Sequence, residues 1–102
     1  MSLTGKQKSF LRSKAHELTP TVQVGKNLVT ETVVDTVAKA LEARELIKIS
    51  VLQNCMAHPS EVAEVLAQHT DAHLVQVIGR VIVLYKKATD PTNRIITNKI
   101  PK

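Results

Sequence analysis

A chain of 102 residues, 43% of them apolar, is long enough for one domain with a single hydrophobic core. Phe10 and Tyr85 are its only aromatic residues, which argues against the platforms of stacked rings used by many single-strand-binding domains. Its one cysteine, Cys55, provides no disulfide framework, and no run approaches the roughly 20 apolar residues of a membrane span. The start of the chain lacks the apolar run of a signal peptide, so we expect a cytoplasmic protein with no membrane partner.

The formal net charge of +5 is unevenly distributed along the sequence. Residues 1–48 carry eight Lys or Arg residues and five Asp or Glu residues, whereas residues 49–78 carry three acidic residues and no Lys or Arg. Residues 79–102 carry six Lys or Arg residues and one acidic residue, Asp90. This segregation predicts a basic binding face and an opposite face, with a nucleic acid backbone as the first partner to consider. The alternative is a generally solvated surface with a basic tail.

The first half of the chain predicts two helices with a short strand between them. An amphipathic helix is expected over residues 4–18, where apolar residues recur at spacings of three and four, and Pro20 ends it. A strand is expected over residues 21–24. Thr30 is then the expected N-cap of a second helix that ends near Arg44.

The second half predicts a strand over residues 46–52 and a third helix that begins at Pro59 and runs to about Thr70. A hairpin follows, with strands at 74–78 and 81–85 around a turn at Gly79-Arg80. Periodicity ends at Ala88, so we expect a domain over residues 1–87 and an extended or mobile tail over residues 88–102. The order α-β-α-β-α-β-β predicts an α/β fold with a four-stranded mixed sheet covered by helices, in which right-handed crossovers make the first three strands parallel.

The junction between the first strand and the second helix is the strongest candidate site. Gly25, Lys26 and Asn27 follow the strand directly, and Thr30 opens the helix shortly afterwards. Glycine allows a sharp turn, Lys26 supplies positive charge, and Asn27 can donate to a phosphate or a ribose beside the positive end of the helix. The alternative is an ordinary connection between a strand and a helix.

A second candidate site consists of cations that would share one footprint on a nucleic acid backbone. Four lie on the first helix, one lies at the hairpin turn, and two follow the last strand. They are Lys6, Lys8, Arg12, Lys14, Arg80, Lys86 and Lys87. Whether these cations cluster depends on how the first helix packs.

The sequence predicts no metal site and no catalytic centre. Cys55-x-x-His58 and His69-x-x-x-His73 have a spacing similar to that of a zinc finger, but the helix expected from Pro59 would separate the two halves. No nucleophile, base and acid stand in a plausible relation, and no phosphate-binding fingerprint is present. We therefore expect a protein that is not an enzyme and needs no cofactor.

Several blocks of sequence occur in a distinctive order and spacing. They are LTGKQK at 3–8, LRSKAH at 11–16, VGKN at 24–27, ELIK at 45–48, LVQVIG at 74–79 and VLYK at 83–86. Together these blocks resemble the YhbY family, the small bacterial stand-alone form of the CRM (CRS1–YhbY) RNA-binding domain.

The resemblance implies a fold similar to the C-terminal domain of bacterial translation initiation factor three. It also implies RNA binding, with association to precursor large ribosomal subunits and a role in their maturation. The family carries a G-x-x-G loop like that of KH domains, and the matching positions here are 25–28. Leu28 stands where the second glycine is expected, which removes easy access to a positive φ. We expect Leu28 to pack instead as an apolar staple before the Thr30 cap.

We therefore expect a monomeric, non-enzymatic protein that binds ribosomal RNA of the large subunit, or its precursor, through backbone and shape contacts. A protein–protein adaptor is the alternative, and it would use the sheet face or the tail residues Ile95, Ile96 and Ile100. Salt dependence distinguishes the two functions, because phosphate contacts weaken steeply with salt and an apolar interface does not.

Overall fold

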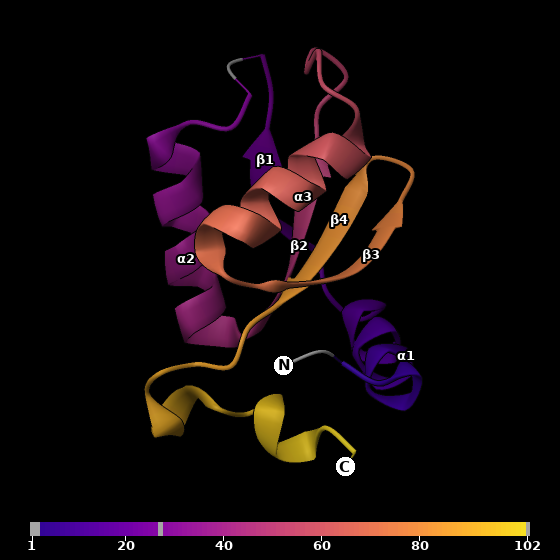
Figure 1. Ribbon diagram of the computed structural model, residues 1–102, viewed down its shortest axis with the longest axis vertical. Coiled ribbons are helices and arrows are strands. Elements are labelled where there is room, and N and C mark those ends of the chain that lie inside the picture. The colour runs from indigo at the N-terminus through magenta and orange to yellow at the C-terminus, as the bar shows by residue number, and fades with distance from the viewer. Residues whose placement is uncertain (1–2, 27, 102) are drawn as a thin grey trace.

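The computed structural model describes residues 3–26 and 28–101, and its elements follow the expected order (Figure 1). The helices are α1 (Gly5–Ala15), α2 (Glu31–Arg44) and α3 (Pro59–Thr70). The strands are β1 (Pro20–Val24), β2 (Leu46–Val51), β3 (His73–Ile78) and β4 (Val81–Tyr85). Two short 3-10 helices follow, η1 (Pro91–Asn93) and η2 (Thr97–Lys99). None of the helices in these ranges has both the length and the apolar character that a membrane crossing requires.

The α1 helix is shorter than the sequence predicts. It ends at Ala15 rather than at Leu18, and His16 is its C-cap. The reason is the position of β1, which begins at Pro20, the partner of Lys48 in the sheet. The chain must leave the helix early enough to reach that partner.

The four strands form one mixed sheet in the order β1-β2-β4-β3. β1 and β2 are parallel, and β4 is antiparallel to both β2 and β3. The first three strands therefore run in one direction, as the sequence predicts, and the last strand is inserted between β2 and β3. In this register Lys48 of β2 faces Val83 of β4, which in turn faces Gln76 of β3.

The α2 and α3 helices cover one face of the sheet and enclose the larger core (Figure 1). Alternate residues of β2 point into it, because successive side chains of a strand project to opposite faces. Ile47, Ile49 and Val51 are accordingly buried there. The helices contribute the buried residues Val37, Leu41, Val62, Ala63 and Leu66.

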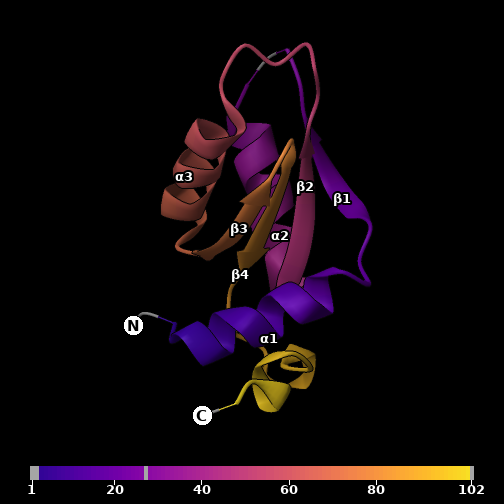
Figure 2. The same cartoon turned by 90° about the vertical axis from the view of Figure 1, so that its right-hand side faces the viewer.

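The other face of the sheet is only half covered, because α1 and the C-terminal segment lie across one end of it (Figure 2). There Leu11 and Ala15 of α1 pack against Leu46, Val75 and Val83 in a second, smaller cluster. In Figure 2 the strands continue beyond α1 with no helix in front of them. Part of the sheet thus remains accessible beside α1.

The segment 88–101 folds back against the domain, whereas the sequence analysis expects an extended or mobile tail. The carboxylate of Glu45, which is fully buried, is the centre of this packing. It accepts hydrogen bonds from the N–H groups of Ala88 (2.8 Å), Ile96 (3.0 Å) and Thr97 (2.9 Å), and from the Thr97 hydroxyl. Ile96 and Ile100 pack against the α1 cluster. One buried acid therefore orders a segment that has no periodicity of its own.

A second carboxylate holds the start of the same segment. Glu42, one turn before Glu45 on α2, accepts from the N–H groups of Thr89 (2.9 Å) and Asp90 (3.0 Å). These donors favour the charged form, so they hold the pKa of Glu42 below its ordinary value. The C-terminal segment is thus attached to the end of α2 by two acidic side chains.

Candidate nucleic-acid interface

The turn between β1 and α2 is tight and packs against the loop that follows β2. The carbonyl of Gly25 accepts from the N–H of Leu28 at 3.0 Å, and Thr30 caps α2 by accepting from the N–H of Val33 at 3.2 Å. A Cβ on Gly25 would lie 3.3 Å from both Asn54 Oδ1 and Leu52 Cδ1, so glycine permits this close approach. The hydrogen bond from Val33 to Thr30 confirms the predicted N-cap of α2.

Lys26 is exposed at this turn, on the loop that leads to the Thr30 N-cap of α2. Asn27, the third residue predicted for the site, lies outside the described residues. The described part of the junction thus presents one free cation and the amino end of a helix at the same edge of the sheet, an arrangement suited to a phosphate.

Leu28 does not pack as the apolar staple that the sequence analysis expects. Its side chain is 39% exposed, and Val29 packs against the core instead. Leu28 adopts a φ of 59°, the left-handed conformation that glycine adopts without strain. The backbone therefore keeps the geometry of a glycine position although the residue is leucine.

Replacing Leu28 with glycine should raise the stability of the domain. A left-handed conformation costs an L-residue about 1 kcal/mol or more, and this side chain recovers little by burial. After the entropic cost of glycine we expect a gain of about 0.5 kcal/mol in the free energy of unfolding, measured by urea denaturation. Leu28→Ala is the control, because it removes the side chain and retains the strain. A loss of stability in Leu28→Gly would mean that contacts of the leucine outweigh the strain.

The α1 cations do not share one direction. Lys8 and Arg12 are four residues apart and lie on the flank of α1 nearest β3, where Lys8 also contributes to lowering the pKa of His73. The main cause of that lowered pKa is the partial burial of His73, whose ring stacks on Tyr85 with centroids 6.0 Å apart. Lys14 lies on the other flank, and its Nζ is 5.8 Å from the centroid of the Phe10 ring. Lys6 is exposed to solvent.

The remaining predicted cations lie at opposite ends of the sheet. Lys86 and Lys87 border a cavity that Gln7 of α1 also lines, so they belong to the α1 end. Arg80 lies at the β3–β4 turn, at the far end, where it donates to the carbonyls of Val51 (3.1 Å) and Leu52 (2.8 Å). Arg80 therefore holds the end of β2, a structural role that the sequence analysis does not anticipate. The predicted cations therefore divide into a group at the α1 end of the sheet and a second position, Arg80, at the far end.

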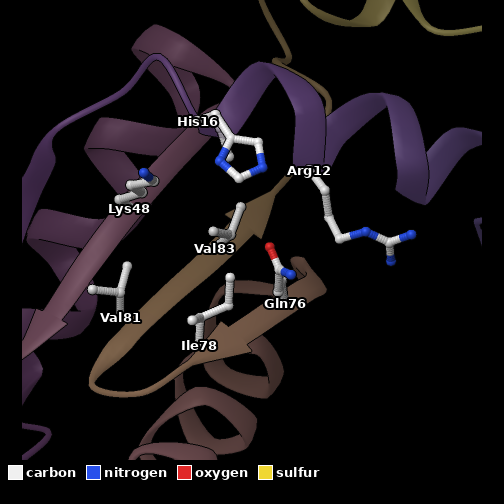
Figure 3. Close-up of a pocket in the computed structure, with 8 residues that line it drawn as sticks. Arg12, His16, Lys48, Gln76, Ile78, Val81 and Val83 are labelled. Atoms are coloured by element: carbon white, nitrogen blue, oxygen red, sulfur yellow. The ribbon is translucent and has the colours of Figure 1, made fainter.

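The uncovered part of the sheet joins these two groups. Beside α1 it forms a shallow hollow of about 140 Å³, which we call the sheet hollow (Figure 3). Arg12 of α1 and His16, the C-cap of α1, lie at its upper edge, Lys48 lies on β2, and Gln76 and Ile78 lie on β3. Val81 and Val83 of β4 form its floor.

Of the polar residues in the sheet hollow, the sequence predicts only Arg12 as part of the site. A signal for Lys48 was present, because it alternates with Ile47 and Ile49 and so had to face away from the larger core. Gln76 alternates less clearly, because the β3–β4 register shifts between Leu74 and Gln76. His16 follows the basic residues of α1 in the sequence, but nothing in the sequence indicates a partner for its ring. None of the residues that line the sheet hollow is acidic.

The exposed acids Glu61 and Glu64 lie on α3, which packs in the larger core, whereas α1 packs in the smaller cluster on the other face of the sheet. The α3 side of the sheet thus carries exposed acidic residues, whereas the α1 side carries cations. This difference agrees with the charge segregation of the sequence. A polyanion would meet its most favourable potential on the α1 side.

Two residues of the zinc-like pattern, Cys55 and His58, have structural roles. Cys55 is buried and its thiol donates to the carbonyl of Ala57 at 3.8 Å, whereas His58 caps α3 by accepting from the N–H of Ser60 at 3.2 Å. Over residues 3–26 and 28–101, no group of three or more His, Cys, Asp or Glu side chains is arranged to hold a metal ion.

Two of the three tail isoleucines proposed for an adaptor function are used internally. Ile96 and Ile100 are packed against the α1 cluster, and Ile95 is 63% exposed. The C-terminal segment therefore does not present a continuous apolar surface built from these three residues.

Comparisons with known proteins agree on one family. The sequence model of the CRS1/YhbY (CRM) domain matches residues 3–86. The chain is similar to the "Probable RNA-binding protein YqeI" of Bacillus subtilis, with 58% identity over 88 residues that cover 86% of this chain and 92% of that protein. It is also similar to a Haemophilus influenzae protein named "RNA-binding protein", with 36% identity over 89 residues that cover 87% of this chain and 90% of that protein.

A solved structure has the same fold. The solution structure of the Staphylococcus aureus protein SAV1595 superimposes with a TM-score of 0.78 at 42% identity, and the match covers 98% of this chain and 100% of that one. The similarity extends beyond residue 86 and so includes the C-terminal segment.

Proposed function

Because this chain belongs to the CRS1/YhbY (CRM) domain family, we propose that it binds RNA, specifically ribosomal RNA of the large subunit or its precursor, and acts in the assembly of that subunit. The names of its relatives support the RNA-binding part of this proposal. The large-subunit target follows from the family resemblance. We further propose that the protein acts as a monomer in the cytoplasm and without catalysis.

The observation that carries the proposal is the distribution of cations around an accessible sheet face. Lys26 and the amino end of α2 lie at one end of the sheet, and Lys8 and Arg12 lie at the other, with half-buried Lys48 between them. Phosphates of a folded RNA would meet these groups in succession, and each contact would release counterions. Scarcity of aromatic residues favours contacts to phosphates and 2′-hydroxyl groups over stacking on rings.

Sedimentation of cell lysate at low salt tests the target of this binding. We expect the protein in the fractions of the large subunit or its precursor, and we expect it to leave them as the salt concentration rises. A protein found only in the ribosome-free fractions would contradict the proposed target. A distribution that did not respond to salt would favour the adaptor function.

Lys26→Ala tests the role of the β1–α2 junction. Loss of this exposed cation should weaken binding of purified ribosomal RNA and reduce the salt slope by roughly 0.7 to 0.9. Leu28→Gly should change affinity less, since the helix terminus and Lys26 remain in place. Lys39→Ala is the matched control, because Lys39 is an exposed lysine of α2 paired with Asp35 at 3.0 Å. If Lys26→Ala behaved like Lys39→Ala, the junction would be a connection only.

A further inference from the structure

We propose that the sheet hollow receives one unpaired base of the bound RNA and discriminates between bases through Gln76. This inference rests on the proposed RNA binding and adds a specificity site to it. The site comprises the apolar floor on β4, the polar side chains of Gln76 and His16, and the cations Arg12 and Lys48 at its edges.

The floor of the sheet hollow suits the flat face of a base. Half-buried Val81 lies on the interior strand β4 opposite Ile78, which is 54% exposed, and buried Val83 lies beneath the α1 end of the floor. Burial of the accessible apolar surface of Ile78 and Val81 by a ligand would be favourable. The base would therefore rest on aliphatic side chains, which explains how the site could work without aromatic residues.

The walls supply groups that can recognise the edge of a base. Gln76 offers an amide donor and an amide acceptor together, and His16 offers a ring nitrogen from the opposite side. Over the described residues, no side-chain hydrogen bond engages Gln76, His16 or Lys48; those that form join other residues, such as Gln7 at the α1 cap, Arg80 at the hairpin turn and Glu45 at the C-terminal segment. These groups are therefore available to a ligand.

The size and charge of the sheet hollow select a single-stranded nucleotide as the occupant. Its volume of about 140 Å³ is smaller than the roughly 300–1,000 Å³ of sites that enclose whole drug-sized ligands, so it fits one ring system and leaves the sugar and phosphate outside. Arg12 and Lys48 lie at separate edges of the sheet hollow, from which they could contact the phosphates that flank the base. A base within an A-form duplex cannot enter, since its faces are stacked and its edges are paired.

Binding of four single-stranded RNA oligonucleotides of equal length, each enriched in one base, and of one duplex tests the proposal. The wild-type protein should prefer one of the single strands over the least favoured by about fivefold or more, the range expected of a bidentate amide contact. Gln76→Ala should reduce this preference to less than about twofold and leave duplex binding and the salt slope unchanged.

Gln23→Ala is the matched control. Gln23 is an exposed glutamine of the edge strand β1, on the same face of the sheet as Gln76, and it lies outside the sheet hollow. It should keep the wild-type preference. His16→Ala changes a second, exposed residue of the sheet hollow and should also reduce the preference. It therefore tests the proposal even if Gln76→Ala fails to fold. Thermal denaturation of each variant establishes that it is folded.

The outcomes separate this inference from the proposed function. Wild-type protein that binds RNA in a salt-dependent manner but shows no base preference would overturn the inference and leave the proposed function standing. A preference retained in both Gln76→Ala and His16→Ala would also overturn it, and would leave the hollow to a partner other than a base. Wild-type protein that bound neither these RNAs nor purified ribosomal RNA would overturn both.

Discussion

Replacing Glu45 with alanine should lower the free energy of unfolding by about 3–5 kcal/mol, because several donors lose their acceptor and each unsatisfied buried donor costs about 1–3 kcal/mol. The variant would leave the N–H groups of Ala88, Ile96 and Thr97 and the Thr97 hydroxyl without their acceptor. The segment 88–101 would have to open to water to satisfy these donors, and the packing of Ile96 and Ile100 on α1 would be lost with it. Urea denaturation measures the loss.

Two further variants make this prediction specific. Glu42→Ala removes a neighbouring carboxylate that holds the same segment by two exposed hydrogen bonds, and it should cost much less. Truncation after residue 87 should destabilise the domain about as much as Glu45→Ala, and the two changes together should be far from additive. Alanine is preferred to glycine because Glu45 has a φ of 65°, so that glycine would also relieve strain. A loss below about 1 kcal/mol in Glu45→Ala would show that the segment contributes little to stability.

Reversing the charge of Lys8 and Arg12 together should cause the largest loss of RNA affinity among the cation variants. The two side chains lie on one flank of α1, and Arg12 also borders the sheet hollow, so one RNA strand would contact both. Lys8→Glu/Arg12→Glu should remove two phosphate contacts and reduce the salt slope of binding by roughly 1.4 to 1.8. Stability should change little, because Lys8 is exposed and the buried residues of α1 are untouched.

Lys39→Glu/Lys99→Glu makes the same change of net charge on other exposed surfaces and serves as the control. Affinity measured at several salt concentrations distinguishes the two double variants. An equal loss in both would mean that the overall charge attracts RNA and that the α1 flank has no special role.

The sequence predicts the fold largely because its elements are locally encoded. Thr30, Pro59 and the Gly79-Arg80 turn each mark an element boundary with residues whose preferences are backbone properties, and the structure confirms all three. Strand direction also followed from connection rules that apply to any α/β chain.

The parts of the structure that the sequence does not predict depend on contacts between distant residues. Glu45 looks like an ordinary helix-end acid, and its donors lie 43 to 52 residues further along the chain. Periodicity cannot report such a contact, so the sequence alone predicts an extended or mobile C-terminal segment. The direction of each α1 cation likewise depends on which side of α1 meets the sheet, and this is set by packing rather than by local preference.

The insertion of β4 between β2 and β3 also determines which edges are exposed while the chain folds. The β3–β4 hairpin is local and can form within microseconds. Pairing of β2 with β4 is slower, because α3 and β3 separate these two strands in the sequence. Until then β2 has an unpaired edge rich in branched aliphatic residues, the kind of edge on which chains aggregate. Docking of the hairpin is therefore the event that protects the folding chain from association with other copies of itself.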